Sequence, residues 1–228
     1  MKPLVSILTP TYNRRQFIPQ YLKYVRAQNY KGPIEILIAD DSDISIKDLV
    51  ENDTRIKYYY FDKKKPLGFK RNLLANEAQG DILVHMDDDD FYPPSRIEHA
   101  VNSLLASDKA IAGCSICFFY NVMTDKITVS GPFANNHGTA GTFAYFREYL
   151  KDHSFQDEAL AQEEPHFTKN FTSPMVQLDP LRTMLVIQHT KNTWDKSKTS
   201  SRPTEVKLKE FIHSIEDRRF YKSLKKQS

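Results

Sequence analysis

The sequence has little cysteine, tryptophan or glycine and no long hydrophobic run. Its 228 residues include 2 Cys, 1 Trp and 7 Gly. The glycines form neither a G-x-x-x-x-G-K nor a G-x-G-x-x-G loop, so the two common glycine-rich phosphate cradles are excluded. No stretch approaches the ~20 apolar residues that cross a bilayer, which excludes a membrane-spanning helix within these residues.

The two cysteines, Cys114 and Cys117, form a C-x-x-C pair inside an apolar run. A zinc site would need a second pair of ligands and a redox site would need flanking Pro or Gly, and neither is present. We therefore expect buried free thiols on a strand. The N-terminus reads directly into a predicted strand rather than a signal peptide, so we expect a cytoplasmic protein.

Charge of one sign is not in excess either. Lys and Arg number 32 against 29 Asp and Glu, a formal net charge of +3. That balance is too even to steer a whole domain onto nucleic acid, so no nucleic-acid partner is predicted. With 40% hydrophobic and 27% charged residues, the chain has the proportions of a globular protein with a sizeable core.

Short apolar runs alternate with helix-like segments in the first half of the chain. The runs are rich in β-branched or aromatic residues and lack polar alternation, which predicts strands covered on both faces. The predicted strands are residues 4–9, 34–39, 56–61 and 82–86, and the predicted helices are 16–27, 69–78 and 94–106. This alternation predicts an α/β fold with a mainly parallel central sheet flanked by helices.

After residue 108 the pattern changes to a smaller, antiparallel part. Two strands at 111–120 and 126–130 are expected to pair across a turn. A glycine-containing loop at 131–141, an acidic helical stretch at 157–171 and an apolar run at 184–188 follow. We divide the chain into a domain at 1–195, with halves at 1–108 and 109–195, and a C-terminal segment at 196–228.

The C-terminal segment is basic, with eight Lys or Arg against four Asp or Glu from residue 202 on. After a linker at 196–203, a helix is predicted from about Glu205, with Thr204 as its N-cap. Its apolar stripe consists of Leu208, Phe211, Ile212 and Ile215. We favour a helix docked on the body; the alternative is a surface for an anionic membrane or a partner subunit.

Polar clusters follow three of the predicted strands at the points where they end. They are T-P-T-Y-N-R at 9–14, D-D-S at 40–42 and D-D-D-D at 87–90. Each alone could be a turn, a loop or a solvated charge run. Because open α/β sheets bind ligands beyond the carboxyl ends of their strands, the three together indicate a binding site.

The four aspartates are the most specific of these clusters. Adjacent carboxylates repel one another, so the cluster is costly unless a cation or hydrogen-bond donors offset the charge. If the strand continues, Asp87 and Asp89 point to one side and Asp88 and Asp90 to the other. Mg²⁺ and Mn²⁺ commonly take one or two carboxylates together with substrate phosphates. The expected ligand is therefore a metal–diphosphate.

Four motifs together carry a resemblance to a known family. S-I-L-T-P-T-Y-N-R, then I-A-D-D-S, then G-F-K-R-N and G-D-I-L-V-H-M-D-D-D-D-F-Y-P-P resemble family 2 glycosyltransferases of the GT-A fold. The similarity runs from about Pro3 to Asn192, and it is greatest to capsid-glycan glycosyltransferases of large DNA viruses. The resemblance implies an inverting, Mn²⁺- or Mg²⁺-dependent transfer of sugar from a UDP-sugar donor to a hydroxyl of a glycan or other acceptor.

The resemblance also implies roles for residues on the donor side. The segment that surrounds the nucleobase and ribose would be Thr9, Pro10, Thr11 and Tyr12. Asp41 is similar to the residue that accepts a hydrogen bond from uracil N3, with Asp40 as the neighbouring candidate. Arg71 resembles the basic residue near the base and the diphosphate.

The D-x-D metal motif of the family resembles residues 87–89. Asp89 is the first choice as metal ligand and Asp87 the second, while Asp88 would lie near the ribose or the sugar. Because all three positions are Asp, the ligand assignment stays open by one residue. His189 lies in a segment similar to the His-and-Asn segment that closes over the diphosphate, where it could contact the metal or a phosphate; a structural role is the alternative.

On the acceptor side, Glu163 and Glu164 resemble the family's catalytic Glu-Asp pair, with Glu164 in the place of the general base. The alternative is a helix N-terminus enriched in acids by the macrodipole. Glycines within 137–143 resemble the acceptor-side loop. Two other functions stay open: a nucleotidyltransferase, which would usually carry a Gly/Lys-rich loop after the first strand, and a non-catalytic module that binds a sugar nucleotide or a glycan.

Overall fold

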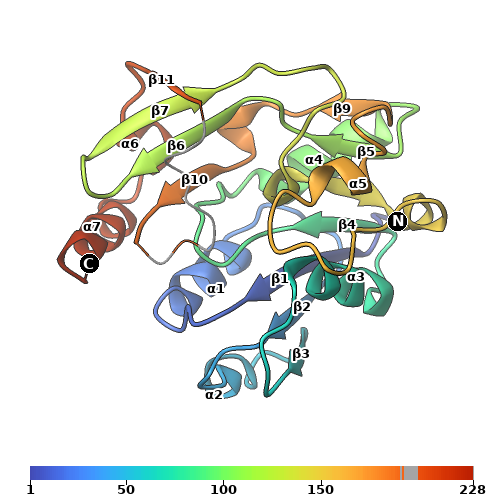
Figure 1. Cartoon of the computed structure of the whole chain (residues 1–228), viewed down its shortest axis with the longest axis horizontal. Helices are drawn as coiled ribbons and strands as arrows, with labels where there is room; N and C mark the ends of the chain where they lie inside the picture. The colour runs from blue at the N-terminus through green and yellow to red at the C-terminus, as the bar shows by residue number, and fades with distance from the viewer. Residues whose placement is uncertain (191, 193–199, 228) are drawn as a thin grey trace.

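The computed structural model describes residues 1–190, 192 and 200–227. The chain forms a seven-stranded sheet of order β3-β2-β1-β4-β8-β5-β9 and a four-stranded sheet of order β10-β6-β7-β11. Figure 1 shows the small sheet at the upper left and the first strands of the large one below it. Residues 196–199 of the predicted linker lie outside the described residues.

The first half of the large sheet is parallel, as the sequence predicted. Its strands are β1 (Val5–Thr11), β2 (Ile34–Asp40), β3 (Ile56–Tyr60) and β4 (Ile82–His85). The connecting helices are α1 (Ile18–Arg26), α2 (Lys47–Val50), α3 (Leu67–Glu77) and α4 (Arg96–Leu105). Every residue of β1 and β4 is buried, which explains why neither strand alternates. The predicted α/β class is confirmed.

The second half of the chain adds three strands to the large sheet and forms the whole of the small sheet. The large sheet gains β5 (Ile111–Gly113), β8 (Ala144–Phe146) and β9 (Met175–Gln177), with β8 antiparallel to both β4 and β5. The small sheet contains β6 (Cys117–Asn121), β7 (Lys126–Ser130), β10 (Leu185–Gln188) and β11 (Arg202–Pro203). The predicted antiparallel pairing of the strands around residues 123–126 is confirmed as β6 with β7.

Two predicted elements of this half are wrong in extent. The run at 111–120 is split between the two sheets, because the N–H groups of Cys114 and Ser115 bond to the side chains of Thr142 and Gln177 instead of a strand. The predicted helix at 157–171 is reduced to α5 (Glu164–Phe167). Left-handed backbone at Gln162 (φ 57°), before α5, and at three consecutive residues after it interrupts a longer helix.

The cysteines are buried free thiols, as predicted, with exposed fractions of 2% for Cys114 and 4% for Cys117. Burial raises the pKa of Cys114 to about 11 and that of Cys117 to about 12. Both side chains are therefore protonated at neutral pH and poor nucleophiles.

The C-terminal segment forms two helices instead of the single one predicted. α6 (Leu208–Phe211) ends at Ile212, whose backbone is extended, and Ser214 then caps α7 (Ile215–Ser223) by accepting a hydrogen bond from the Asp217 N–H. Thr204 accepts from the Val206 N–H and lies before α6 rather than at its N-cap. The break divides the predicted stripe, because Phe211 is 5% exposed and Ile215 is 60% exposed.

Both C-terminal helices dock on the body of the protein. Phe211 packs on Phe118 of β6, with ring centroids 5.1 Å apart. α7 lies beside α1, where the Asp217 carboxylate accepts from Lys23 at 2.7 Å and from Gln20 at 2.9 Å (Figure 1). This packing occupies most of the apolar surface that a membrane or partner would need. In the described part of the chain, every helix is too short or too polar to cross a bilayer.

Phe211→Ala tests this docking, with Ile215→Ala as its matched control from the same predicted stripe. We expect Phe211→Ala to lower the free energy of unfolding by about 3–5 kcal/mol, because it leaves a cavity against β6. Ile215→Ala should change it by less than about 0.5 kcal/mol. Urea unfolding measures both, and equal losses would contradict the docked arrangement.

Candidate active site

A cavity of about 510 Å³ lies beyond the C-terminal ends of β1 and β4. The strand order reverses between these two strands, which is where open α/β sheets bind ligands. The predicted site residues that line the cavity are Pro10, Thr11, Tyr12, Arg71, Asp87, Asp89, Glu163 and Glu164. Those that lie outside its lining are Thr9, Asp40, Asp41, Asp88 and His189.

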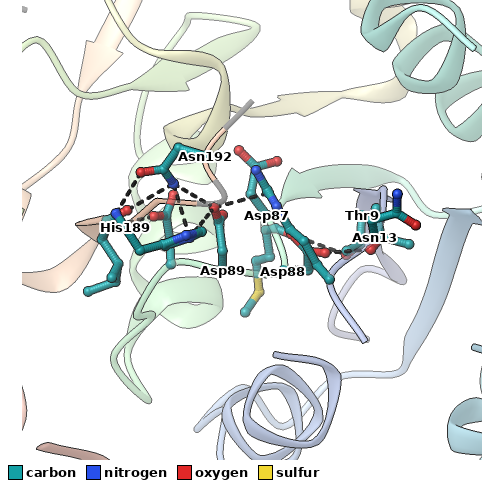
Figure 2. Close-up of polar contacts among 12 residues, drawn as sticks. Thr9, Asn13, Asp87, Asp88, Asp89, His189 and Asn192 are labelled. Carbon is teal, nitrogen blue, oxygen red and sulfur yellow. Dashed lines mark hydrogen bonds and ion pairs between the residues drawn. The ribbon is translucent and has the colours of Figure 1, made fainter. Parts of the chain in front are cut away.

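The two threonines of the first cluster connect β1 to the residues after β4. The Thr9 hydroxyl donates to the Met86 carbonyl oxygen at 2.8 Å, and the Thr11 hydroxyl donates to Asp88 Oδ2 at 2.5 Å. Figure 2 shows the Thr9 region to one side of the aspartates. Thr9 is fully buried, so it shapes the edge of the cavity and has no surface for a ligand.

Asp40 and Asp41 both have their oxygens occupied by this chain. Asp40 accepts from the N–H groups of Ser42 and Ile46 and from the Tyr58 hydroxyl, which shapes the loop after β2. Asp41 accepts from Lys70 Nζ and from a backbone N–H after β3, each at 2.6 Å. The uracil contact expected of Asp41 stays a prediction, and it requires the residues around this fully buried side chain to move.

The start of α3 is fixed against the loop that leads to the acidic pair. The N–H of Gly68 donates to the Ala159 carbonyl at 2.9 Å, so the loop satisfies a helix N-terminus that no side chain caps. A Cβ at Gly68 would lie 1.9 Å from the Gln156 carbonyl oxygen, so only glycine permits this approach. The contact places Lys70 and Arg71, on the first turns of α3, next to the cavity.

The strand ends at His85 and the chain turns at Asp88 and Asp89, so the alternation expected of a continued strand does not apply to the four aspartates. The turn lets each carboxylate meet a different partner. Asp87 pairs with Arg71, Asp88 and Asp89 both pair with Arg14, and Asp90 accepts from the Ile187 N–H at 2.8 Å. These cations and donors offset the repulsion that the sequence implies.

Arg14 is the main functional residue that sequence reasoning left unassigned. Its Nη1 lies 2.9 Å from Asp88 Oδ1 and 3.0 Å from Asp89 Oδ2. Burial acts to lower its pKa, but the charges of Asp89 and Asp88 outweigh this effect and raise it. Lys70 and Asn192 were also unassigned. Arg14 and Lys70 lie in motifs quoted for the resemblance and Asn192 lies in the His-and-Asn segment, and those positions were the available signal.

His189 and Asn192 converge on Asp89 (Figure 2). His189 Nε2 lies 3.0 Å from Asp89 Oδ2, and Asn192 Nδ2 donates to the same oxygen at 3.0 Å. The His189 ring also packs against the ring of Phe17, the residue before α1, with ring centroids 4.6 Å apart. His189 therefore contacts the predicted metal ligand directly, although it does not line the cavity.

Arg71 forms a buried ion-pair network with two acids of the site. Its Nε donates to Glu163 at 2.8 Å and its Nη1 to Asp87 at 3.2 Å. Nη1 also lies 3.0 Å from His85 Nδ1. Burial lowers the pKa of His85 well below its usual value, with the Arg71 charge adding to the effect. His85 is therefore neutral, and because Arg71 can only donate, His85 Nδ1 accepts while its Nε2–H donates to the Tyr145 hydroxyl.

Glu163 and Glu164 are adjacent in the chain but have different hydrogen-bond partners. Glu163 is held by Arg71 and is 5% exposed. Glu164 has the Ala140 N–H as a donor at 3.0 Å. Burial raises the pKa of Glu164 to about 7, and the nearby charge of Glu163 adds to the rise. Glu164 is thus the carboxylate of the pair that gains and loses a proton near neutral pH, as a general base requires.

Comparison with known proteins identifies the family of this chain. Residues 6–167 match the glycosyl transferase family 2. The chain belongs to this family. Its members are enzymes. The chain superposes on S. aureus TarS 1–349 in complex with UDP-GlcNAc with a TM-score of 0.67 and 20% identity, over 88% of this chain and 62% of that one.

A second solved structure has the same fold. It is the mannosyltransferase PcManGT from Pyrobaculum calidifontis in complex with GDP-Man and Mn²⁺, with a TM-score of 0.64 and 17% identity over 82% of this chain and 57% of that one. These likenesses confirm the GT-A fold expected from the resemblance.

Curated relatives match part of the chain at higher identity. The putative colanic acid biosynthesis glycosyl transferase WcaA of Escherichia coli is 36% identical over 100 residues, which are 42% of this chain and 36% of that protein. A Campylobacter jejuni GalNAc(5)-diNAcBac-PP-undecaprenol beta-1,3-glucosyltransferase is 33% identical over 95 residues, 39% of this chain and 30% of that protein. The match thus spans well under half of these relatives.

Replacing each glutamate by glutamine should change stability in opposite directions at pH 8. Glu163→Gln removes the charge that pairs with buried Arg71, so we expect a loss of about 1–3 kcal/mol. The folded state raises the pKa of Glu164 from 4.5 to about 7, so it holds a proton that the unfolded state releases between these values. Wild-type stability therefore falls as pH rises through this window.

Glu164→Gln has no carboxyl group to ionise, so it avoids the fall in stability that the wild type shows as pH rises. It should therefore melt higher than wild type at pH 8, while the two proteins should melt alike near pH 4. Thermal melting of the unliganded proteins measures both variants. If Glu164→Gln instead melts lower than Glu163→Gln at pH 8, the assignment of the protonated glutamate is reversed.

Proposed function

We propose that this chain transfers a sugar from a UDP-sugar to an acceptor hydroxyl, with inversion at the anomeric carbon and with a divalent metal. The observation that carries the proposal is the position of Glu164. It lines the same cavity as Asp87, Asp89 and Arg71, and its pKa of about 7 suits a general base. Family 2 membership and a neighbour that binds UDP-GlcNAc support the reaction class.

The donor is proposed to lie against the wall formed by β1, α3 and the residues after β4. Arg14 and Arg71 line this wall and can attract the two phosphates. Tyr12, whose ring lies under Lys64 Nζ at 4.4 Å, offers an aromatic face for the base. Uridine is our choice because of the Asp41 resemblance; guanosine is the alternative that the neighbour with GDP-Man raises.

A Mn²⁺ or Mg²⁺ ion fits this wall as a partner of the donor. Among the described residues no three His, Cys, Asp or Glu side chains form a ready-made metal site. Asp89 and His189 offer two ligands 3.0 Å apart, and ions of this type take their remaining ligands from phosphates and water. Asp87 is the second carboxylate proposed as a ligand of the metal. A metal at Asp89 would replace its ion pair with Arg14 and would add positive charge at the diphosphate.

The residues of the chain then account for the bond changes. Glu164 takes the proton of the acceptor hydroxyl as its oxygen bonds to the anomeric carbon. The bond from that carbon to the diphosphate oxygen breaks on the opposite face, and the electron pair leaves with UDP. Arg71, held by Glu163 and Asp87, stabilises the negative charge on the leaving group. The step yields an inverted product in a single displacement.

A donor screen tests this proposal. The chain is incubated with Mn²⁺ and a panel of UDP- and GDP-sugars, and release of the nucleoside diphosphate is measured with and without acceptors. We expect release from UDP-sugars. Binding without release would favour the non-catalytic module, and release of pyrophosphate from a nucleoside triphosphate would favour the nucleotidyltransferase.

The cytoplasmic location, the division at residue 195 and the viral resemblance stay predictions.

Glu164→Gln should reduce kcat by about 10²–10⁴-fold, the usual cost of a missing general base. Donor affinity should change little, because the proposed donor contacts are made by β1, α3 and the residues after β4 and do not include Glu164. Glu158→Gln, at an exposed position of the preceding loop, is the matched control and should keep wild-type kcat. In the wild type kcat should rise with pH through about 7, since the base must be deprotonated. A flat profile would exclude Glu164 as the base.

Asp89→Asn should weaken Mn²⁺-dependent UDP binding by about 100-fold, because the first metal ligand is lost. Asp108→Asn, at an exposed position between α4 and β5, is the control. Calorimetric titration of UDP with and without Mn²⁺ measures the effect. If both variants bind UDP as wild type does in Mn²⁺, Asp89 does not hold the metal.

A further inference from the structure

The cavity has two walls of different chemistry. The wall from the first half of the chain carries Arg14, Lys70, Arg71 and the aspartates of the turn after β4. The wall from the second half is largely apolar, and its charged members are Glu163 and Glu164. Its larger apolar and aromatic residues include Phe119, Phe133, His137, Phe171, Met184 and Val186. The proposed donor occupies the charged wall, whereas these apolar and aromatic residues have no role in the function proposed above.

Three rings in contact lie on the apolar wall. The His137 ring is stacked on Phe171 and tilted against Phe133, with its centroid 4.5 Å from each of the two. We call this group the ring stack. The Gln177 amide at the end of β9 fixes the loop that carries it, by donating to the carbonyls of Asn135 at 2.7 Å and His137 at 3.0 Å. Phe133 is nevertheless 49% exposed, although an aromatic ring gains most by burial.

The apolar wall offers no positive charge to a ligand. The cations among the described lining residues are Arg14, Lys70 and Arg71, and each is ion-paired with a buried acid. Burial lowers the pKa of His137, so its ring is neutral at pH 7. Glu163 and Glu164, the wall's charged members, would repel an anion. A ligand on this wall is therefore neutral close to the rings.

The ring stack also lies close in the chain to the proposed base. Glu164 accepts a hydrogen bond from the N–H of Ala140, three residues after His137. Phe171 follows α5, the helix that begins at Glu164. The ring stack and the base are thus carried by the same two segments of the wall.

We propose that the ring stack is the acceptor subsite and that it selects a neutral pyranoside, whose apolar C–H face lies on Phe133, over an acidic sugar. The inference rests on the proposed glycosyl transfer and adds the class of acceptor. A pyranose has one face of C–H groups that packs on aromatic rings, while its hydroxyls stay at the edge. One of these hydroxyls can then be presented to Glu164.

Saturation-transfer NMR on the full chain with Mn²⁺ and UDP tests the subsite with probes of known structure. The probes are methyl β-D-glucopyranoside and methyl β-D-glucuronopyranoside, which differ only at C6, together with decyl phosphate. We expect saturation of the neutral glycoside at its ring C–H protons and at least about fivefold weaker binding of the uronoside. Preferred binding of decyl phosphate would assign the wall to a lipid chain, and equal or absent binding of the glycosides would also overturn the proposal.

Variants locate the binding on the ring stack. Phe133→Ala should weaken the neutral glycoside about fivefold, as the loss of one aromatic contact predicts, and Phe133→Leu should do nearly the same. Leu181→Ala removes an apolar side chain of the same exposure, 49%, outside the cavity and should have no effect. Unchanged glycoside affinity in Phe133→Ala would contradict the proposal.

Titration with UDP-GlcNAc separates this inference from the function on which it rests. If the donor binds with Mn²⁺ and the glycosides do not, the acceptor subsite is wrong and the proposed function stands. If the donor itself does not bind, the proposed function fails first. The Phe133 variants should bind the donor as wild type does, because Phe133 belongs to the opposite wall.

Discussion

Arg71 is a buried cation that joins three distant parts of the chain. It lies on α3 and pairs with Asp87 at the end of the central sheet and with Glu163 at the start of α5. A buried arginine left without a partner costs several kcal/mol, so these segments are held together by the need to satisfy it. Neutral His85 accepts a hydrogen bond from the Arg71 guanidinium. The two walls of the cavity are therefore positioned by one side chain.

The same interaction separates the roles of two neighbouring acids. Glu163 is ion-paired with Arg71, whereas Glu164 accepts from the Ala140 N–H. Burial raises the pKa of Glu164, and the neighbouring charge of Glu163 adds to the rise. Arg14 has a comparable effect on the aspartates, since it allows two adjacent carboxylates to be buried side by side. These ion pairs fix the charged wall of the cavity.

The first four strands and their helices could be predicted because each is a continuous buried run or a regular amphipathic segment, readable within its own residues. The motif residues Arg71, Asp87 and Glu163 were also named from sequence, and the fold brings them together. What the sequence could not supply were the partners. The choice of Arg14 as counter-ion and the turn at Asp88 depend on contacts between residues far apart in the chain.

The errors have the same origin. The run at 111–120 is apolar throughout, and only the distant side chains of Thr142 and Gln177 divide it between two sheets. The C-terminal stripe is regular as far as Ile215, but the chain leaves the helix at Ile212 and Ser214 starts a new one. The ring stack has no sequence pattern at all, because Phe133, His137 and Phe171 belong to two loops. The local sequence pattern predicted most helices and strands, whereas the arrangement of the site depends on contacts between residues far apart in the chain.

The stereochemistry of a single transfer tests the account most directly. A UDP-α-sugar labelled with ¹³C at the anomeric carbon is mixed with the chain, Mn²⁺ and a methyl glycoside acceptor, and the first product is observed by NMR. The account predicts a β-linked product together with UDP. An α-linked product, or no cleavage of the anomeric bond with any UDP-sugar, would contradict the single displacement assigned to Glu164.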